Sequence, residues 1–258
     1  MEKLVRIKYS KDGPLQYISH LNLVQVFSRT LRRADIPVVI SGGFNPRFKI
    51  SFGPPLPLGI SSNSEYLDLK LKEAVNLGEL KEKINQVSPL GLKIIKAREI
   101  PLNSESLTKI IDSAAYLIIL KRKLNKDLEE VSKRGFREED FHQNKIKEEN
   151  LGEISPEEVL EKARGNIRDF LSLKEIRVEK QTPKGTKNID TRPLILKMEA
   201  QRYKDQILKL ELWLSIGPAG NLNPRYVIGS WLSSCGDYDF DIRQIYRKGL
   251  YARGKAVI

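Results

Sequence analysis

Alternating hydrophobic and polar residues in the first hundred positions predict strands and helices in the order βαββαβ. Strands are expected at 4–8, 38–40, 48–52, 65–71 and 92–100, with the two short strands at 38–40 and 48–52 counted as one unit. Helices are expected after the capping residue Ser19 and at 77–87. The apolar stripe of the first helix consists of His20, Val24, Phe27, Leu31 and Ala34. This order is the ferredoxin-like split βαβ pattern.

The second half repeats the theme with additional segments. Strands are expected at 114–120, 176–178, 194–198, 207–216 and 242–251, and helices begin at Ser155 and Asn223. Residues 121–154 hold nine basic and nine acidic residues, which indicates a solvated insertion. We therefore predict an α+β protein of two tandem ferredoxin-like domains, 1–102 and 103–258, the second decorated by the charged insertion at about 121–154.

Positive charge is concentrated in two distant segments of the chain. The formal net charge is +12, of which residues 1–52 contribute +6 and residues 243–258 contribute +5. Such concentration favours a polyanionic partner, and RNA is the simplest candidate. Two alternatives remain open: an acidic protein partner, or basic residues that only keep the surface soluble.

Cofactor and membrane signals are missing from the sequence. It has one cysteine and two histidines, and it contains neither a P-loop nor a GxGxxG motif. A radical SAM enzyme needs clustered cysteines for its iron–sulfur cluster, and zinc sites draw on several Cys or His ligands. We therefore expect no metal and no cofactor in this chain. We also expect no membrane-spanning segment, because no apolar run is long enough to span a bilayer. The first residues show no export signal and a single cysteine fits a reducing compartment, so we expect a cytoplasmic protein.

The loop at 42–49 is the first candidate binding site. Its paired glycines allow a sharp turn, and its aromatic and basic residues are the mixture that stacks bases and neutralises phosphates. The alternative is a glycine turn that enters a strand whose phenylalanines are core. The candidate nucleic-acid-binding residues here are Phe44, Asn45, Arg47, Phe48 and Lys49.

Two further segments combine cations with turns or aromatic residues. The first is a predicted hairpin turn with Lys184, Lys187 and Arg192, which could equally be an ordinary exposed tip. The second is the last strand, with Arg243, Tyr246, Arg247 and Lys248. We expect the loop, the hairpin turn and the last strand to converge on one positive cleft between the domains. His20 is a weak candidate for general acid/base chemistry, and the alternative is a helix-start histidine with a local hydrogen bond.

The same segments resemble a known family. The runs KYSKDGPLQYISHLNL and SGGFNPRFKISFGPPLPLGISSNSEYLDLKL are similar to the bacterial radical SAM-associated family, a domain of unknown function, and KQTPKGTKNIDTRPLIL and IYRKGLYA resemble it too. Its members occur alone or fused behind a cobalamin-binding radical SAM module, often encoded near ribosomal-protein and ribonuclease genes. The resemblance implies a free-standing member with a cobalamin-binding radical SAM partner. The typical loop reads closer to GFNPHPK, so Arg47 and Phe48 here argue against an obligatory catalytic histidine in that loop.

Three functions follow, in order of preference. The first is an RNA-binding accessory without activity of its own, which presents RNA to a separate radical SAM enzyme in RNA or ribosome-related modification. The second is an RNA-processing enzyme that uses His20. The third is a protein-interaction subunit that does not touch RNA.

Overall fold

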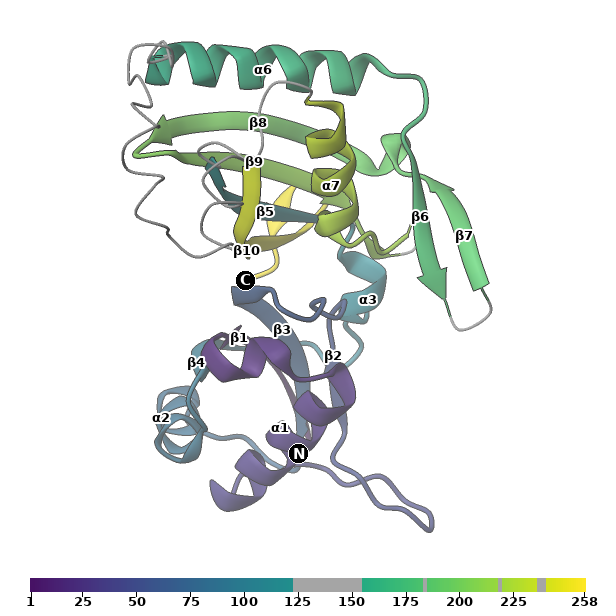
Figure 1. Ribbon diagram of the computed structural model, residues 1–258. Coiled ribbons are helices and arrows are strands. Elements are labelled where there is room, and N and C mark those ends of the chain that lie inside the picture. Colours follow the sequence, from purple (N-terminus) through teal and green to yellow (C-terminus); the bar gives the residue numbers. More distant parts are fainter. Residues whose placement is uncertain (123–154, 183–184, 218–219, 236–239) are drawn as a thin grey trace, which may run out of the picture.

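The chain forms a mixed α/β structure around one large mixed sheet (Figure 1). The computed structural model describes residues 1–122, 155–182, 185–217, 220–235 and 240–258. The expected charged insertion therefore falls almost entirely outside the described residues.

The elements of the first half are β1 (Lys3–Lys11), α1 (His20–Arg33), β2 (Ile50–Phe52), β3 (Ser61–Leu71), α2 (Leu77–Val87) and β4 (Leu92–Ile100). Those of the second half are α3 (Leu107–Ile110), β5 (Ser113–Arg122), α6 (Pro156–Ser172), β6 (Arg177–Thr182), β7 (Gly185–Asp190), β8 (Ile195–Lys204), β9 (Ile207–Ser215), α7 (Pro224–Ser234), β10 (Phe240–Ala252) and β11 (Lys255–Ala256).

The strand order along the main sheet is β4-β1-β3-β10-β5-β9-β8. Within the first half, β4, β1 and β3 are antiparallel neighbours, and β2 pairs antiparallel with the outer edge of β3. Within the second half, β10, β5, β9 and β8 are also antiparallel neighbours. The sequence pattern predicted two separate sheets. Instead, a short parallel pairing of β3 with β10 makes the sheet continuous, because Ser61 lies opposite Tyr246 and Ser62 opposite Arg247.

Each half buries its own hydrophobic core. The first core lies between the sheet and helices α1 and α2, and includes Phe27, whose ring meets Tyr9 edge-on at 4.8 Å. The second core lies under α6 and α7 and includes the fully buried Trp231. The cores do not divide at the predicted boundary of 102/103, because Leu56, Ile60 and Tyr66 pack in the second core. Residues before β3 therefore help to hold the two halves together.

Local sequence explains where α1 begins and ends. The Ser19 hydroxyl accepts a hydrogen bond from the Asn22 N–H at 3.2 Å, which satisfies one of the free donors of the first turn. The helix ends at Arg33, and Asp35 then adopts a left-handed φ of 50° two residues before Pro37. Proline cannot continue a helix, and the residue before it is restricted to extended conformations. The chain is thereby turned back along the sheet edge toward the loop at 42–49.

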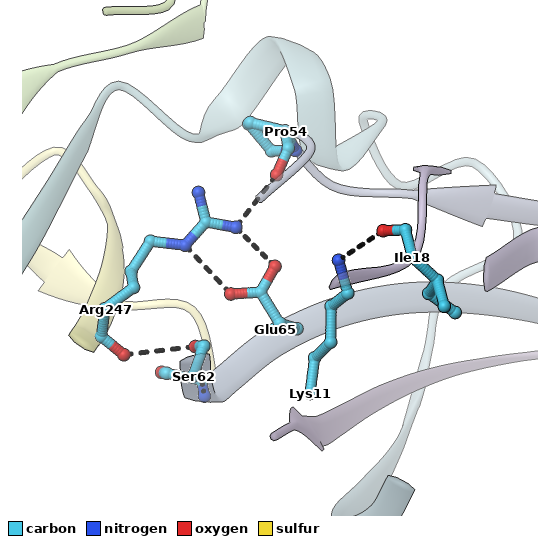
Figure 2. Close-up of polar contacts among 7 residues, drawn as sticks. Lys11, Ile18, Pro54, Ser62, Glu65 and Arg247 are labelled. Atoms are coloured by element: carbon cyan, nitrogen blue, oxygen red, sulfur yellow. Dashed lines mark hydrogen bonds and ion pairs between the residues drawn. The ribbon is translucent and has the colours of Figure 1, made fainter. Parts of the chain in front are cut away.

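A buried ion pair lies at the junction of the halves. The guanidinium of Arg247 on β10 binds both carboxylate oxygens of Glu65 on β3, with Nε at 2.8 Å from Oε1 (Figure 2). Arg247 is 0% exposed and Glu65 is 3% exposed. Nη2 of Arg247 also donates to the Pro54 carbonyl at 3.1 Å, and the Ser62 hydroxyl donates to the Arg247 carbonyl at 3.0 Å. The pair is thus bidentate and anchored to the backbone of both halves.

Further ionisable groups surround this pair. Burial alone would lower the pKa of Arg247, but the Glu65 carboxylate offsets this effect and raises it above the ordinary arginine value. Lys11 is also buried, donates to the Ile18 carbonyl at 3.0 Å, and has its pKa lowered chiefly by burial. Burial raises the pKa of Tyr116, an effect opposed by Arg247. Glu65 is therefore the carboxylate that balances a buried cation at the junction, and its loss is costly.

We predict that Glu65→Gln lowers the free energy of unfolding by roughly 3–5 kcal/mol, because it leaves the Arg247 charge buried without a counter-ion. The double variant Glu65→Leu with Arg247→Met should recover most of this loss, since it removes both charges from the interior. Urea denaturation followed by circular dichroism measures both changes.

The matched control is Glu99→Gln, which breaks the half-exposed Lys3–Glu99 pair and should cost less than about 1 kcal/mol. A Glu65→Gln protein as stable as the Glu99→Gln protein would contradict the structural role assigned to the junction.

Candidate nucleic-acid interface

An open groove of about 740 Å³ runs between α1 and the segment that leads into β2. One wall belongs to the helix and the other to residues 40–50, whose loop before β2 projects away from the second half of the molecule in Figure 1. The groove is lined by Leu21, Val24, Gln25, Ser28, Arg29, Arg32, Ile40, Pro46, Arg47, Phe48 and Ile50. We refer to it as the α1 groove.

The helical wall is a second strip of side chains on α1. The core strip contains the buried Leu23, Phe27 and Leu31. The groove strip starts at Leu21 and ends at Arg32, and its members recur three or four residues apart, so they share one face of the helix. Val24, expected to be core, is half-buried and belongs to the groove strip.

The opposite wall is a loop held closed at its base. The Ser41 N–H donates to the Arg47 carbonyl at 2.8 Å, and the Arg47 N–H donates to the Ser41 hydroxyl at 3.0 Å. Between them, Gly43 has a φ of 101°, which a residue with a Cβ rarely adopts. Phe44 follows at the apex and is fully exposed. The glycine therefore allows a turn that presents an aromatic ring to solvent.

The two walls run alongside each other in opposite directions. Phe52, at the end of β2, meets the His20 ring edge-on at 5.3 Å, at the start of α1. Phe48 lies beneath the guanidinium of Arg32, near the end of α1, at 5.8 Å. The end of the groove at Leu21 therefore adjoins His20, which is not itself part of the lining, and the opposite end holds the Arg32 guanidinium above the Phe48 ring.

All charged side chains that line the α1 groove are positive. Its lining includes Arg29, Arg32 and Arg47, and none of its lining residues is acidic. Across the described ranges, no ion pair joins any of these three side chains to a carboxylate. All three side chains are exposed, so their charge is available to an anion.

The five candidates in the loop at 42–49 lie together. Arg47 and Phe48 line the groove. Phe44, Asn45 and Lys49 are exposed on the same loop. The alternative is that the phenylalanines of this loop belong to the core. Phe44 does not, because it is fully exposed, whereas Phe48 is half-buried against the first core.

The hairpin candidates are not part of this groove. Lys187 is exposed on β7, in a hairpin that extends from the second half (Figure 1). Arg192 is half-buried, and its guanidinium donates to the carbonyls of Leu171 at 2.8 Å and Ile195 at 3.4 Å. It therefore fixes local backbone. Lys184 lies outside the described residues.

The candidates on β10 require a correction. Arg247 is completely buried against Glu65, so the prediction that it contacts a polyanion is wrong. The expected single cleft that included Arg247 is wrong for the same reason. Lys248 is exposed and lies 3.7 Å from Glu211, Arg243 lies 3.9 Å from Asp241, and Tyr246 is half-buried.

His20 is exposed at the first residue of α1, next to the groove residue Leu21. Partial burial of its ring, and to a lesser extent the nearby Lys11 charge, lowers its pKa below the ordinary value of 6.5. The imidazole is therefore mainly neutral at pH 7, a form that can accept a proton.

Sequence reasoning missed Arg29 and Arg32. Both lie in the run SRTLRRA, whose three arginines close together on α1 were a usable signal. The sequence pattern of this helix predicts only its apolar stripe. Its outer face becomes one wall of a groove only because residues 40–50 lie against it, and that contact is not visible in the sequence.

The described part of the chain contains no cluster of three His, Cys, Asp or Glu side chains that could hold a metal ion. Nor does any described helix combine the length and the apolar character that crossing a membrane requires.

Comparisons with solved structures gave distant matches. A Cbf5–Nop10–Gar1 complex matches with 9% sequence identity and a TM-score of 0.46, over 95% of this chain and 48% of the matched chain. The archaeal box H/ACA sRNP Nop10–Cbf5 complex matches with 10% identity and a TM-score of 0.41, over 94% of this chain and 46% of the other. The chain thus spans about half the length of the chains it matches, and neither similarity identifies a ligand. No curated protein matches the sequence.

A family model matches residues 4–224, from β1 to the first residue of α7. The family is described as an uncharacterized protein conserved in bacteria (DUF2344), with no mention of radical SAM enzymes. Because the match covers most of the sequence, the chain belongs to the bacterial family DUF2344.

Proposed function

We propose that this protein binds nucleic acid, most simply RNA, in the α1 groove. The observation that carries the proposal is the convergence of Arg29, Arg32 and Arg47 on an open groove whose lining contains no carboxylate. Phosphates are the natural partners of unpaired guanidinium groups, which can bind them in bidentate fashion. The aromatic side chains of the same loop supply contacts that a simple anion could not use.

The radical SAM partner forms a second layer of the proposal. The resemblance of the sequence motifs to radical SAM-associated proteins supports it. One cysteine in the whole sequence means that any iron–sulfur cluster would be held by the partner. We propose that the protein presents RNA to such an enzyme. Co-purification from native cells, with and without ribonuclease, separates a direct contact from one bridged by RNA.

We also propose to class the two halves as ferredoxin-like units. Each orders its four main strands as fourth, first, third and second along the chain, and all neighbours within a half are antiparallel. The βαββαβ sequence pattern supports the same assignment.

An RNA-processing activity is the second candidate, and the position of His20 favours it. A neutral imidazole beside one end of a cationic groove could accept a proton from a ribose hydroxyl. Incubation of cellular RNA with the purified protein tests this candidate. Cleavage that is lost in His20→Ala would support it, and intact RNA with the wild-type protein would remove it.

We predict that replacing the three groove arginines by glutamine lowers RNA affinity at least tenfold at moderate salt. Each lost phosphate contact should also reduce the slope of log affinity against log salt concentration by roughly 0.7, the value for single strands. Fluorescence polarisation with labelled cellular RNA fragments, repeated across a salt series, measures both effects.

The charge-matched control replaces the exposed Lys83, Lys109 and Lys174 by glutamine. This variant loses as much net charge as the groove variant but keeps the three groove arginines. It should therefore bind within about twofold of the wild type, whereas attraction by net charge alone would weaken both variants equally. Equal losses in the two variants would mean that the α1 groove is not the site.

A separate prediction concerns His20. Its ring should titrate in NMR spectra with a midpoint below 6.5, because burial disfavours the imidazolium. His142 is the other histidine of the chain, so the resonance that remains in the His142→Gln variant belongs to His20. A midpoint at or above 6.5 would show that the ring is more solvated, or nearer to an acid, than the structure indicates.

A further inference from the structure

We infer that the α1 groove selects unpaired RNA over duplex RNA, an inference that rests on the proposed function. A duplex offers a protein mainly phosphates, sugars and the edges of stacked bases, so it needs a cationic surface and little else. The α1 groove has a different composition. More than half of its lining is apolar or aromatic, and only three of its side chains are charged.

Two of these apolar side chains are strongly exposed. Leu21 on the helical wall is 75% exposed, and Ile40 on the loop wall is 48% exposed. Both line the groove beside the arginines. Single exposed hydrophobic residues are ordinary, but apolar residues that gather with cations on facing walls mark a binding surface. Unstacked bases have apolar faces that fit such walls, whereas a duplex keeps those faces inside its own stack.

The loop wall adds two aromatic rings in different settings. Phe44 is fully exposed at the apex of a loop whose base is closed by Ser41 and Arg47, so its ring is held away from the core. Phe48 lies under the guanidinium of Arg32 at 5.8 Å, and both side chains line the groove. Aromatic rings and guanidinium planes are the two protein surfaces on which single-stranded bases stack.

The dimensions agree with a short single strand. The groove strip of α1 runs from Leu21 to Arg32, about 16 Å at a rise of roughly 1.5 Å per residue. The arginines and the aromatic platform lie toward one end, and Leu21 lies at the other. A strand laid along the groove would place phosphates against Arg29, Arg32 and Arg47 while bases meet the apolar wall.

The test compares one labelled RNA strand with the same strand annealed to its complement, by fluorescence polarisation with the full chain at moderate salt. We expect at least tenfold tighter binding of the single strand. Phe44→Ala should weaken binding of the single strand by roughly fivefold or more, in the range of one lost base stack, and leave duplex binding unchanged. Leu90→Ala, which removes another exposed apolar side chain, is the matched control and should have no effect.

Three outcomes would overturn the inference. Equal affinity for single strand and duplex would retain an RNA-binding groove but remove its selectivity. Competition by poly-glutamate as effective as that of unlabelled single strand would show that the groove binds polyanions without using the bases. Absence of binding to either RNA would remove the proposed function together with this inference.

Discussion

The buried pair between Glu65 and Arg247 is the interaction on which the arrangement of the two halves depends. It lies beside the point where β3 and β10 pair at two residue positions, and it adds a side-chain link to that short backbone contact. A buried ion pair gives little net stability compared with an apolar contact, but breaking it leaves a charge without a partner. The pairing therefore favours the register that places Glu65 beside Arg247, because loss of either partner would leave a buried charge unpaired.

The same edge of β3 is shared by several segments of the chain. β10 occupies the edge at Ser61 and Ser62, while β2 pairs only with Leu67 to Leu69. Because β2 is antiparallel to β3, the chain before β2 runs toward Leu71 and away from β10, and Val38 forms an isolated bridge with Leu71 on this edge. Between Val38 and β2 the chain leaves the edge as the loop at 42–49, which is closed at its base by Ser41 and Arg47. This excursion supplies the wall of the α1 groove that faces the helix.

Local sequence patterns predicted most helices and strands of the fold. The features that they did not predict depend on contacts between residues far apart in the chain. The helix at 77–87 and the strand at 92–100 coincide with α2 and β4, because each has a clear period and strong end signals. The continuous sheet was not predictable, since it depends on pairing between residues 185 positions apart. Arg47 was identified in the candidate site because it lies beside glycines and aromatic residues. Arg247 was assigned to the same site by composition alone, and only its burial shows that it is structural.

The central claim is that nucleic acid lies between α1 and the loop at 42–49. Photocrosslinking measures this directly, with RNA that carries 4-thiouridine and with mass spectrometry to locate the modified peptides. Our account predicts crosslinks in residues 20–33 and 40–50, with Phe44 and Phe48 the foremost acceptors because they present aromatic rings at the groove. Crosslinks confined to the β6–β7 hairpin or to β10, with none in these two segments, would contradict it.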